Sequence, residues 1–318
     1  MPKHISPRIL HDIIDIAAGT NHVIALSNSG KIFTWGSGEQ YQLGRRCSPR
    51  DHTLALHPTN VTFLTRAADQ RYLHELQHTS ADSTPIATPR GSPTRQLQPP
   101  QPVTGTGPFL GVFAGGYHSF VLSKSYQLWA CGLNNYGQTG AGSNEQVQEV
   151  FRIGTLAYPI TASSTAMHQA PDHVVHVCAG EQHSLATTAA GRVFVFGRSD
   201  SNQLGLPPMA SRPVSANKVD SLVEAFAETS IGAYKSVPIE HPTLRNIEKC
   251  GAAGQWSAAV DKEGRLYTWG YGDNGQLATG ECHDEETPQL IALKSRKVLA
   301  LGCGGQHMVM LLTKKVDE

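Results

Sequence analysis

Four histidines stand at equivalent places along the chain and are the residues best suited to chemistry: His22, His118, His183 and His307. An imidazole can act as a general base, bind a transition metal or make a structural hydrogen bond. Recurrence favours the structural role, because a catalytic site is needed once whereas an architectural contact is needed in every unit. A metal-dependent hydrolase built on these histidines is therefore the weakest of our hypotheses.

Each histidine belongs to a repeat with constant spacing. From His22, Gly30 follows at the eighth position, Gly36 ends an aromatic-Gly pair at the fourteenth, and Gly44 ends a Leu-Gly pair at the twenty-second. A Gly-x-x-His motif contains each histidine, and a fifth copy stops after residues 304–312. The same spacing in the second, third and fourth copies reaches Gly132 and Gly140, then Gly191, Gly197 and Gly205, then Gly264 and Gly270.

Short runs of β-prone residues must position the histidines and glycines of the repeat. Residues 23–26 and 31–35 flank Asn-Ser-Gly, which is typical of a tight hairpin turn. A third run precedes each Gly-x-x-His motif, and a fourth lies in some linkers, as at 287–291. Small sheets that stack radially on their neighbours form a β-propeller. We therefore predict an all-β propeller of about four and a half repeats.

The copies differ at a few informative positions. Trp256 replaces the histidine in the fourth copy, and Tyr126 replaces the hairpin glycine in the second, so we expect a different turn there. The residues just before the histidine position also vary, and we expect them to surround one mouth of the propeller: Asn21, Tyr117, Gln182, Gln255 and Gln306.

Composition limits the class of protein. The 318 residues are 39% hydrophobic and 16% charged, with 26 Lys and Arg against 26 Asp and Glu. This balance lacks the basic excess typical of nucleic-acid binding, so any such binding needs a local patch. No apolar run approaches the length that spans a membrane, and we expect a cytosolic or nuclear protein without a membrane partner.

The sequence shows no sign of a cofactor or a metal. The six cysteines have neither a Cys-x-x-Cys pair nor zinc-finger spacing, and we interpret them as small buried side chains. Glycine-rich phosphate loops, HExxH helices and GxSxG elbows are also missing. We predict no cofactor, no metal and no covalent catalysis.

The chain is organised as one partial propeller domain over residues 1–318. Within it, residues 78–107 are rich in Ser, Thr, Pro and Gly, which predicts a disordered insertion. Residues 217–229 have apolar side chains at helical spacing and are a candidate helix.

Residues 36–45 and 131–140 carry the Gly-rich loops of a known repeat, GSGEQYQLGR and CGLNNYGQTG. Together with the Gly-x-x-His motifs and the Trp-Gly hairpin ends, they resemble the regulator of chromosome condensation family over four full copies and one partial copy. The resemblance implies a seven-bladed propeller that acts as guanine-nucleotide exchange factor for the small GTPase Ran. It also implies a second face that holds histones and nucleosomal DNA, in a nuclear, chromatin-associated protein, with a cytoplasmic pool as an alternative.

The same resemblance assigns roles to particular residues. It implies a GTPase-binding face that includes Asn21, Gln182, His183 and His307, and exchange factors of the family carry Asp where this chain has Asn21. Further candidates for that face lie in the loops before the Leu-Gly position or its equivalent: Glu39, Asn134, Asp200 and Asp273. Structural positions of the repeat are His22, His118, Gly36, Gly132, Gly197 and Gly270.

The chain departs from the family in its number of repeats. About four and a half copies stand where the family has seven, and the copies matching the N-terminal blades and the family's wedge-like hairpin are missing. We therefore expect the C-terminal part of a propeller, from a fragment or a truncated gene, with weakened exchange activity. The alternative is a non-catalytic scaffold that binds another protein. Exchange would need only differential binding of the nucleotide-free GTPase, so whether the chain is a catalyst stays open.

Overall fold

The computed structural model describes residues 10, 12–45, 47, 55–61, 108–145, 147–156, 172–207 and 234–314. Within these ranges the chain forms four antiparallel sheets of four strands and one of two strands. The predicted insertion at 78–107 and the candidate helix at 217–229 lie outside the described residues. No helix in the described part is long and apolar enough to cross a membrane.

We call the five sheets blades 1 to 5 in chain order. Their strands follow one another in the sequence, and a short 3₁₀ helix, η1 (Gly154–Leu156), follows the second blade. The strands are β1 (Ile13–Ala18), β2 (His22–Ser27), β3 (Ile32–Gly36) and β4 (Thr59–Asn60) in blade 1; β5 (Phe109–Ala114), β6 (His118–Ser123), β7 (Leu128–Gly132) and β8 (Val147–Arg152) in blade 2; β9 (Val174–Ala179), β10 (His183–Thr188), β11 (Val193–Arg198) and β12 (Tyr234–Glu240) in blade 3; β13 (Ile247–Ala253), β14 (Trp256–Asp261), β15 (Leu266–Gly270) and β16 (Glu285–Ile291) in blade 4; and β17 (Val298–Gly304) and β18 (His307–Leu312) in blade 5.

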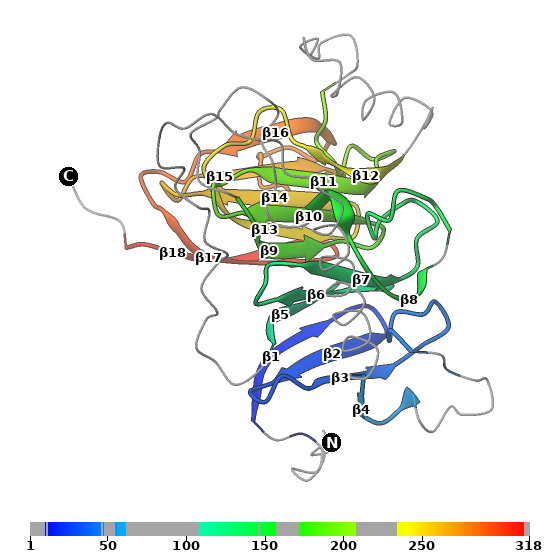
Figure 1. Ribbon diagram of the computed structural model, residues 1–318. Helices are drawn as coiled ribbons and strands as arrows, with labels where there is room; N and C mark the ends of the chain where they lie inside the picture. Colours follow the sequence, from blue (N-terminus) through cyan, green and yellow to red (C-terminus); the bar gives the residue numbers. More distant parts are fainter. Residues whose placement is uncertain are drawn as a thin grey trace, which may run out of the picture.

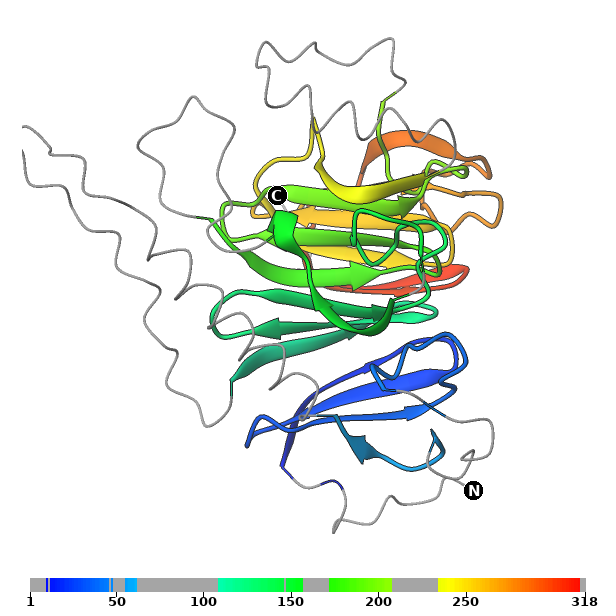
Figure 2. The same cartoon turned by 45° about the vertical axis from the view of Figure 1, so that its right-hand side comes forward.

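The blades stack face to face in chain order (Figure 1). The first strand of each blade contacts the first strand of the next, from β1 through β5, β9 and β13 to β17. Apolar side chains fill each gap between neighbouring sheets. Figure 2 shows the stacking of blades 1 and 2 from a second angle. The predicted propeller of about four and a half repeats is confirmed.

The glycine at the end of each third strand has a structural cause. It lies opposite the first residue of the second strand, as Gly36 lies opposite His22. Its φ lies between 97° and 114° in the four complete blades, and a Cβ there would overlap the carbonyl oxygen of the residue before the histidine position. Only glycine meets both conditions. The same holds for Gly132, Gly197 and Gly270.

One expectation about local structure was wrong. The hairpin at Tyr126 is not different, because Tyr126 adopts a φ of 58° and its N–H bonds to Ser123 O, as Gly30 N–H bonds to Ser27 O. The Tyr126 ring packs against His173 with centroids 3.7 Å apart. Strand β12 is the fourth strand of blade 3, and its Pro238 is tolerated because the strand is at the sheet edge.

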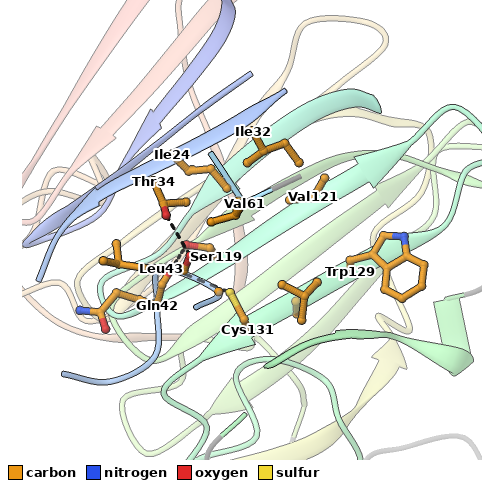
Figure 3. Close-up of a pocket in the computed structure, with 13 residues that line it drawn as sticks. Ile24, Ile32, Thr34, Gln42, Leu43, Val61, Ser119, Val121, Trp129 and Cys131 are labelled. Carbon is orange, nitrogen blue, oxygen red and sulfur yellow. Dashed lines mark hydrogen bonds between the residues drawn. The ribbon is translucent and has the colours of Figure 1, made fainter. Parts of the chain in front are cut away.

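A hydrogen-bond relay joins blade 1 to blade 2, and Figure 3 shows the part of it between Ser119 and Gln42. The buried His22 Nε2 lies 2.8 Å from Ser119 Oγ in the next blade, and that hydroxyl donates to Gln42 O, back in the first blade, at 2.8 Å. The surrounding apolar gap measures only about 10 Å³. The two blades are thus closely packed around a polar chain whose members each find a partner.

The relay repeats at the next two interfaces. His118 Nε2 pairs with Ser184 Oγ, and His183 Nε2 with Ser257 Oγ, both at 2.8 Å. The serines donate to Gln138 O and Gln203 O. Each serine hydroxyl donates its only proton to a carbonyl oxygen, so it can only accept a hydrogen bond from the histidine. The histidine is therefore the neutral Nε2–H tautomer.

Burial keeps these rings neutral. Loss of solvation lowers the pKa of His22 to about 4 and the pKa values of His118 and His183 to about 3. Each Nδ1 is buried without a hydrogen-bond partner in the described part of the chain, so a proton there would be an uncompensated charge. The burial and the hydrogen bonds of the three histidines favour the structural role that the repeat predicts.

The fourth interface replaces both members of the relay. Met308 stands where blade 5 would need the serine, and Trp256 stands in place of the blade 4 histidine. The indole Nε1–H donates instead to the backbone of blade 5, reaching Gly304 O at 3.2 Å and Gly305 O at 3.1 Å. The exchange of histidine for tryptophan therefore accompanies the loss of its serine partner.

The glycine of the Gly-x-x-His motif is required by the ring of the same motif. In the first three copies an added Cβ would overlap the histidine Cε1, and it would also crowd a carbonyl oxygen of the next blade. The histidine can therefore lie flat over the turn only because the glycine has no side chain. These glycines are Gly19, Gly115 and Gly180.

Replacing Gly180 by alanine should destabilise the protein by about 1–3 kcal/mol through overpacking against His183. Urea denaturation followed by circular dichroism measures the loss. Gly154→Ala is the matched control, because no described atom lies within 4 Å of its added Cβ, and it should leave the midpoint nearly unchanged. Equal midpoints for the two variants would refute the packing argument.

The buried histidines also predict acid sensitivity. The unfolded chain takes up protons on His22, His118 and His183 below pH about 6.5, whereas the folded state does so only near pH 3–4. Stability should therefore be complete above pH 6.5 and fall towards pH 4, by at most about 1.4 kcal/mol per pH unit for each ring. Urea midpoints at pH 7.5, 6.0 and 5.0 test this.

His118→Gln provides the comparison, because an amide can still donate to Ser184 but does not titrate. The slope of stability against pH between 7.5 and 5.0 should be shallower in this variant than in the parent chain. Identical slopes would show that His118 does not contribute to the acid sensitivity.

Candidate partner-binding face

Two sets of loops emerge from the same end of the stacked blades. One set is the turns between first and second strands, which end at the residue before the histidine position. The other set joins third to fourth strands, over 37–45, 133–145, 199–207 and 271–284. They share one end because the histidine position pairs with the glycine that closes the third strand. We call this surface the loop face.

Backbone hydrogen bonds link the inner turns of the loop face from blade to blade. Thr20 N–H donates to Gly116 O, Gly116 N–H to Gly180 O, and Glu181 N–H to Gly254 O, at 2.8–3.1 Å. We call this row of inner turns the rim. The relay histidines lie directly beneath it, so the rim is fixed both by these histidines and by the hydrogen bonds between neighbouring turns. Side chains on it are presented from a fixed backbone.

The predicted partner residues fall into two groups. Asn21, Glu39 and His307 are exposed and Gln182 is half-buried, so these four can touch a partner. His183 has no exposed surface and is bonded to Ser257, so its assignment to direct partner contact was wrong; it acts below the rim.

Asn134 is also excluded from direct contact. It is fully buried, its amide nitrogen donates to Ser143 O and Glu145 O, and its oxygen accepts from Thr139. These bonds hold the third-to-fourth-strand loop of blade 2 in shape. The other residues in equivalent loops, Asp200 and Asp273, are exposed.

Sequence reasoning missed a cluster around Arg198 at the end of β11. Its Nε donates to Asp200 Oδ2 at 2.8 Å and its Nη1 to Gln182 Oε1 at 2.6 Å. Its guanidinium carbon also lies 4.9 Å from the centre of the Tyr136 ring of blade 2, within cation–π range. An arginine directly after the Phe-Gly pair was the available signal, because the other complete copies have Ser, Leu or Tyr there.

The Arg198 cluster ties adjacent blades together at the surface. The hydrogen bond from Arg198 to Asp200 raises the pKa of Arg198, which is charged at every physiological pH. Further along the rim, Ser201 Oγ donates to Gln255 Oε1 of blade 4 at 2.9 Å. The varied residues Gln182 and Gln255 therefore have fixed orientations, as a recognition surface requires.

Charge is unequally divided between the two ends of the blades. We call the opposite end, with the turns between second and third strands, the hairpin face. Among the described residues, acidic side chains prevail on the loop face: Glu39, Glu145, Glu181, Asp200, Asp273, Glu281 and Asp284. Basic side chains prevail on the hairpin face: Lys31, Lys124, Arg192, Arg245, Lys262, Arg265, Lys294, Arg296, Lys297 and Lys314. The neutral total thus conceals two faces of opposite charge.

The loop face is suited to binding rather than to covalent chemistry. Its buried histidines are neutral and already engaged, so they are not available as general bases. In the part of the chain that the structure describes, no group of three His, Cys, Asp or Glu side chains could hold a metal ion. The loop face is a rigid, polar and largely acidic surface.

Comparison with known proteins places this geometry in context. The chain is 28% identical over 308 residues to Protein pim1 of Schizosaccharomyces pombe, covering 95% of this chain and 46% of that protein. It is 28% identical over 318 residues to Guanine nucleotide exchange factor SRM1 of Saccharomyces cerevisiae, covering 97% and 52%. The chain thus spans about half the length of these relatives.

Solved structures agree on the fold. The crystal structure of Prp20p from Saccharomyces cerevisiae matches with a TM-score of 0.68 at 23% identity, over 96% of this chain and 57% of that one. Prp20p is described as having binding properties to Gsp1p and histones. The family model described as RCC1-like domain matches residues 1–310. The chain belongs to the RCC1-like domain family.

Proposed function

We propose that this chain is a guanine-nucleotide exchange factor for a Ran-like small GTPase, or the C-terminal part of one. The observation that carries the proposal is the similarity of this chain, over almost its whole length, to SRM1, which is named as an exchange factor. The rigid loop face supports it, since Asn21, Glu39, Gln182 and His307 stand on it with exposed or half-exposed side chains. Because the chain spans about half of SRM1, the activity of the whole relative is carried over as a proposal.

The mechanism would be differential binding. A GTPase holds GDP through cationic groups and Mg²⁺ around the phosphates. An acidic loop face attracts those same groups, so it would bind the nucleotide-free GTPase more tightly than the GDP-bound form and thereby speed GDP release. The buried relay would contribute by fixing the rim, and no bond need be made or broken.

The hairpin face offers a site for a second partner. Its prevailing basic side chains supply the local patch that nucleic-acid binding needs in a chain of zero net charge. We extend the proposal to nucleosomal DNA and histones as partners, and to a nuclear, chromatin-associated location. The binding of Prp20p to histones supports this extension by analogy.

A non-catalytic scaffold is the second candidate. The observation in its favour is Asn21, which is neutral where exchange factors of the family carry Asp. A scaffold would bind a GTPase or another protein through the loop face without changing its nucleotide affinity. Substoichiometric acceleration of GDP release separates the two candidates, because a pure binder cannot turn over.

Release of a fluorescent GDP analogue from purified Ran tests the proposal. The folded chain at one-tenth of the Ran concentration should accelerate release, and Asn21→Asp should accelerate it about tenfold further, as about 1.4 kcal/mol of added differential binding would do. Asn28→Asp is the matched control, since it makes the same charge change on the hairpin face and should have no effect.

Two results would oppose the proposal. Unchanged GDP release with a chain shown to be folded by circular dichroism would favour the scaffold. Equal acceleration by Asn21→Asp and Asn28→Asp would show that net charge, and not contact through the loop face, controls the rate.

A further inference from the structure

A polar cavity opens on the hairpin face of blade 4, beside the segment that enters this blade from β12. Its volume is about 340 Å³, in the range that small ligands occupy. Its polar lining consists of Thr243, Arg245, Asn246, Arg265 and Tyr267. The cavity lies on the opposite face from the loops discussed above, so it is independent of the proposed exchange function.

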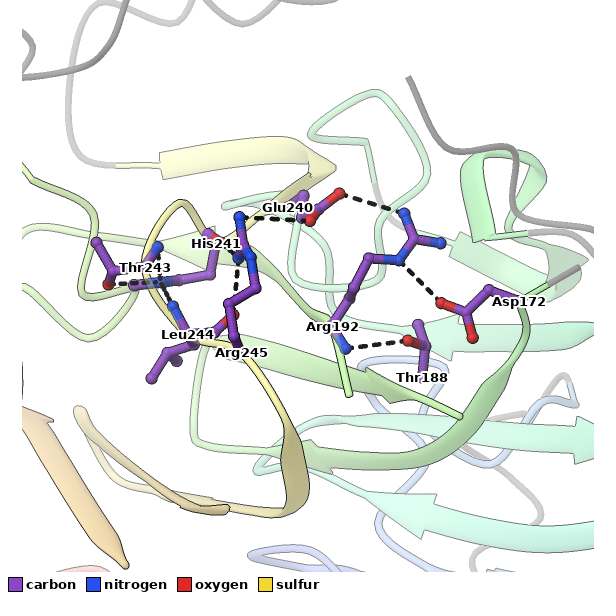
Figure 4. A network of polar contacts seen from close by, with 8 residues as sticks. All are labelled: Asp172, Thr188, Arg192, Glu240, His241, Thr243, Leu244 and Arg245. Carbon is purple, nitrogen blue, oxygen red and sulfur yellow. Dashed lines mark hydrogen bonds and ion pairs between the residues drawn. The ribbon is translucent and has the colours of Figure 1, made fainter. Parts of the chain in front are cut away.

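Arg245 is held in place by the backbone of its own loop (Figure 4). Its Nη1 donates to His241 O and to Leu244 O, both at 2.7 Å. The loop itself is fixed by the buried His241, whose Nε2 donates to Gly205 O at 2.9 Å. Two bonds through a single nitrogen restrain the guanidinium, which is still half-exposed.

Arg265 lines the same cavity from the turn just before β15, and Asp261 holds its side chain in place. Its Nε donates to Asp261 Oδ2 at 2.6 Å, and Asp261 has no exposed surface. That carboxylate also accepts from Tyr267 Oη at 3.2 Å and from the backbone N–H groups of Glu263 and Arg265. Asp261 therefore serves as a fixed anchor for both Arg265 and Tyr267.

Among the described residues no carboxylate lines the cavity, whose charged lining is the two guanidinium groups. Three acids, Asp261, Glu240 and Glu263, lie within 4 Å of the arginines without lining the cavity. Glu240 lies 3.8 Å from Arg245 but only 3.2 Å from Arg192, with which it chiefly pairs. Glu263 is exposed and 3.4 Å from Arg265, an arrangement that contributes little in water. The lining thus offers two guanidinium groups and neutral hydrogen-bonding groups, and Asp261 offsets part of the charge of Arg265.

We propose that this cavity binds the phosphate group of a small phosphomonoester. Two restrained guanidinium groups in one cavity provide the paired donors that a tetrahedral oxyanion accepts. Leu244, Ile247 and Pro288 form apolar walls that suit the organic part of such a ligand. A cavity with a limited volume favours a small ligand over a DNA duplex, whose phosphates lie on a convex surface and are met by open basic surfaces.

Isothermal titration of the full chain with inorganic phosphate, and then with glycerol 3-phosphate, tests this proposal at constant ionic strength. Saturable binding of both is expected, with glycerol 3-phosphate the tighter of the two. Arg245→Gln should weaken phosphate binding about tenfold, the effect of one charged hydrogen bond. Arg245→Lys keeps the charge but not the fork of donors, so its affinity should be intermediate.

Lys262→Gln is the matched control, because Lys262 is an exposed cation on the same hairpin that does not line the cavity. It should bind phosphate as the parent chain does. Equal weakening by Arg245→Gln and Lys262→Gln, or no saturable binding to a chain that is folded by circular dichroism, would overturn the proposal. Displacement of phosphate by a short DNA duplex, lost in Arg245→Gln, would assign the site to nucleic acid and contradict a small ligand.

Discussion

The stack of blades depends on one repeated interaction. A buried histidine donates a hydrogen bond to a serine of the next blade, and that serine donates to a backbone carbonyl of the histidine's own blade. A typical hydrogen bond adds only about 1 kcal/mol net, but a buried donor left without a partner costs more than that. The relay therefore chiefly selects the correct blade pairing. The glycine that accommodates each ring completes the requirement, because any side chain there would expel it.

This constraint also explains where function can lie. The residues that recur in every repeat pack the blades together, and the histidines among them are neutral and buried. Recognition is left to the residues that the relay supports from below, which differ between copies, and to the longer loops beside them. Rigid support and variable side chains together suit a surface that must distinguish two states of a partner.

Much of the fold could be predicted from the sequence because spacing alone reveals the repeat. Gly36 and His22 are opposite each other in register, so their constant separation identifies the hairpin. Burial could not be predicted in the same way, and the expected contact role of His183 fails because nothing local shows that Ser257, seventy-four positions away, covers it. The turn at Tyr126 departs from expectation because a stacked partner can hold a non-glycine residue at positive φ.

The candidate sites likewise include residues that the sequence predicts and residues that only the structure reveals. Asn21 and Glu39 follow directly from the repeat, since its spacing places both in turns at one end of the blade, where they are exposed. The Arg198 cluster and the cavity at Arg245 and Arg265 depend on contacts between segments that are distant in sequence or hidden in irregular loops. Spacing carries no information about such contacts, and only the folded arrangement reveals them.

Each of the interface histidines His22, His118 and His183 is neutral and donates through Nε2. Nuclear magnetic resonance of the ¹⁵N-labelled imidazole of His118, assigned with His118→Gln, tests it directly. The account predicts a proton on Nε2 alone, with no titration between pH 7.5 and 5. An Nδ1–H tautomer, or protonation of the ring near pH 6.5, would contradict the relay on which the rest of the structure depends.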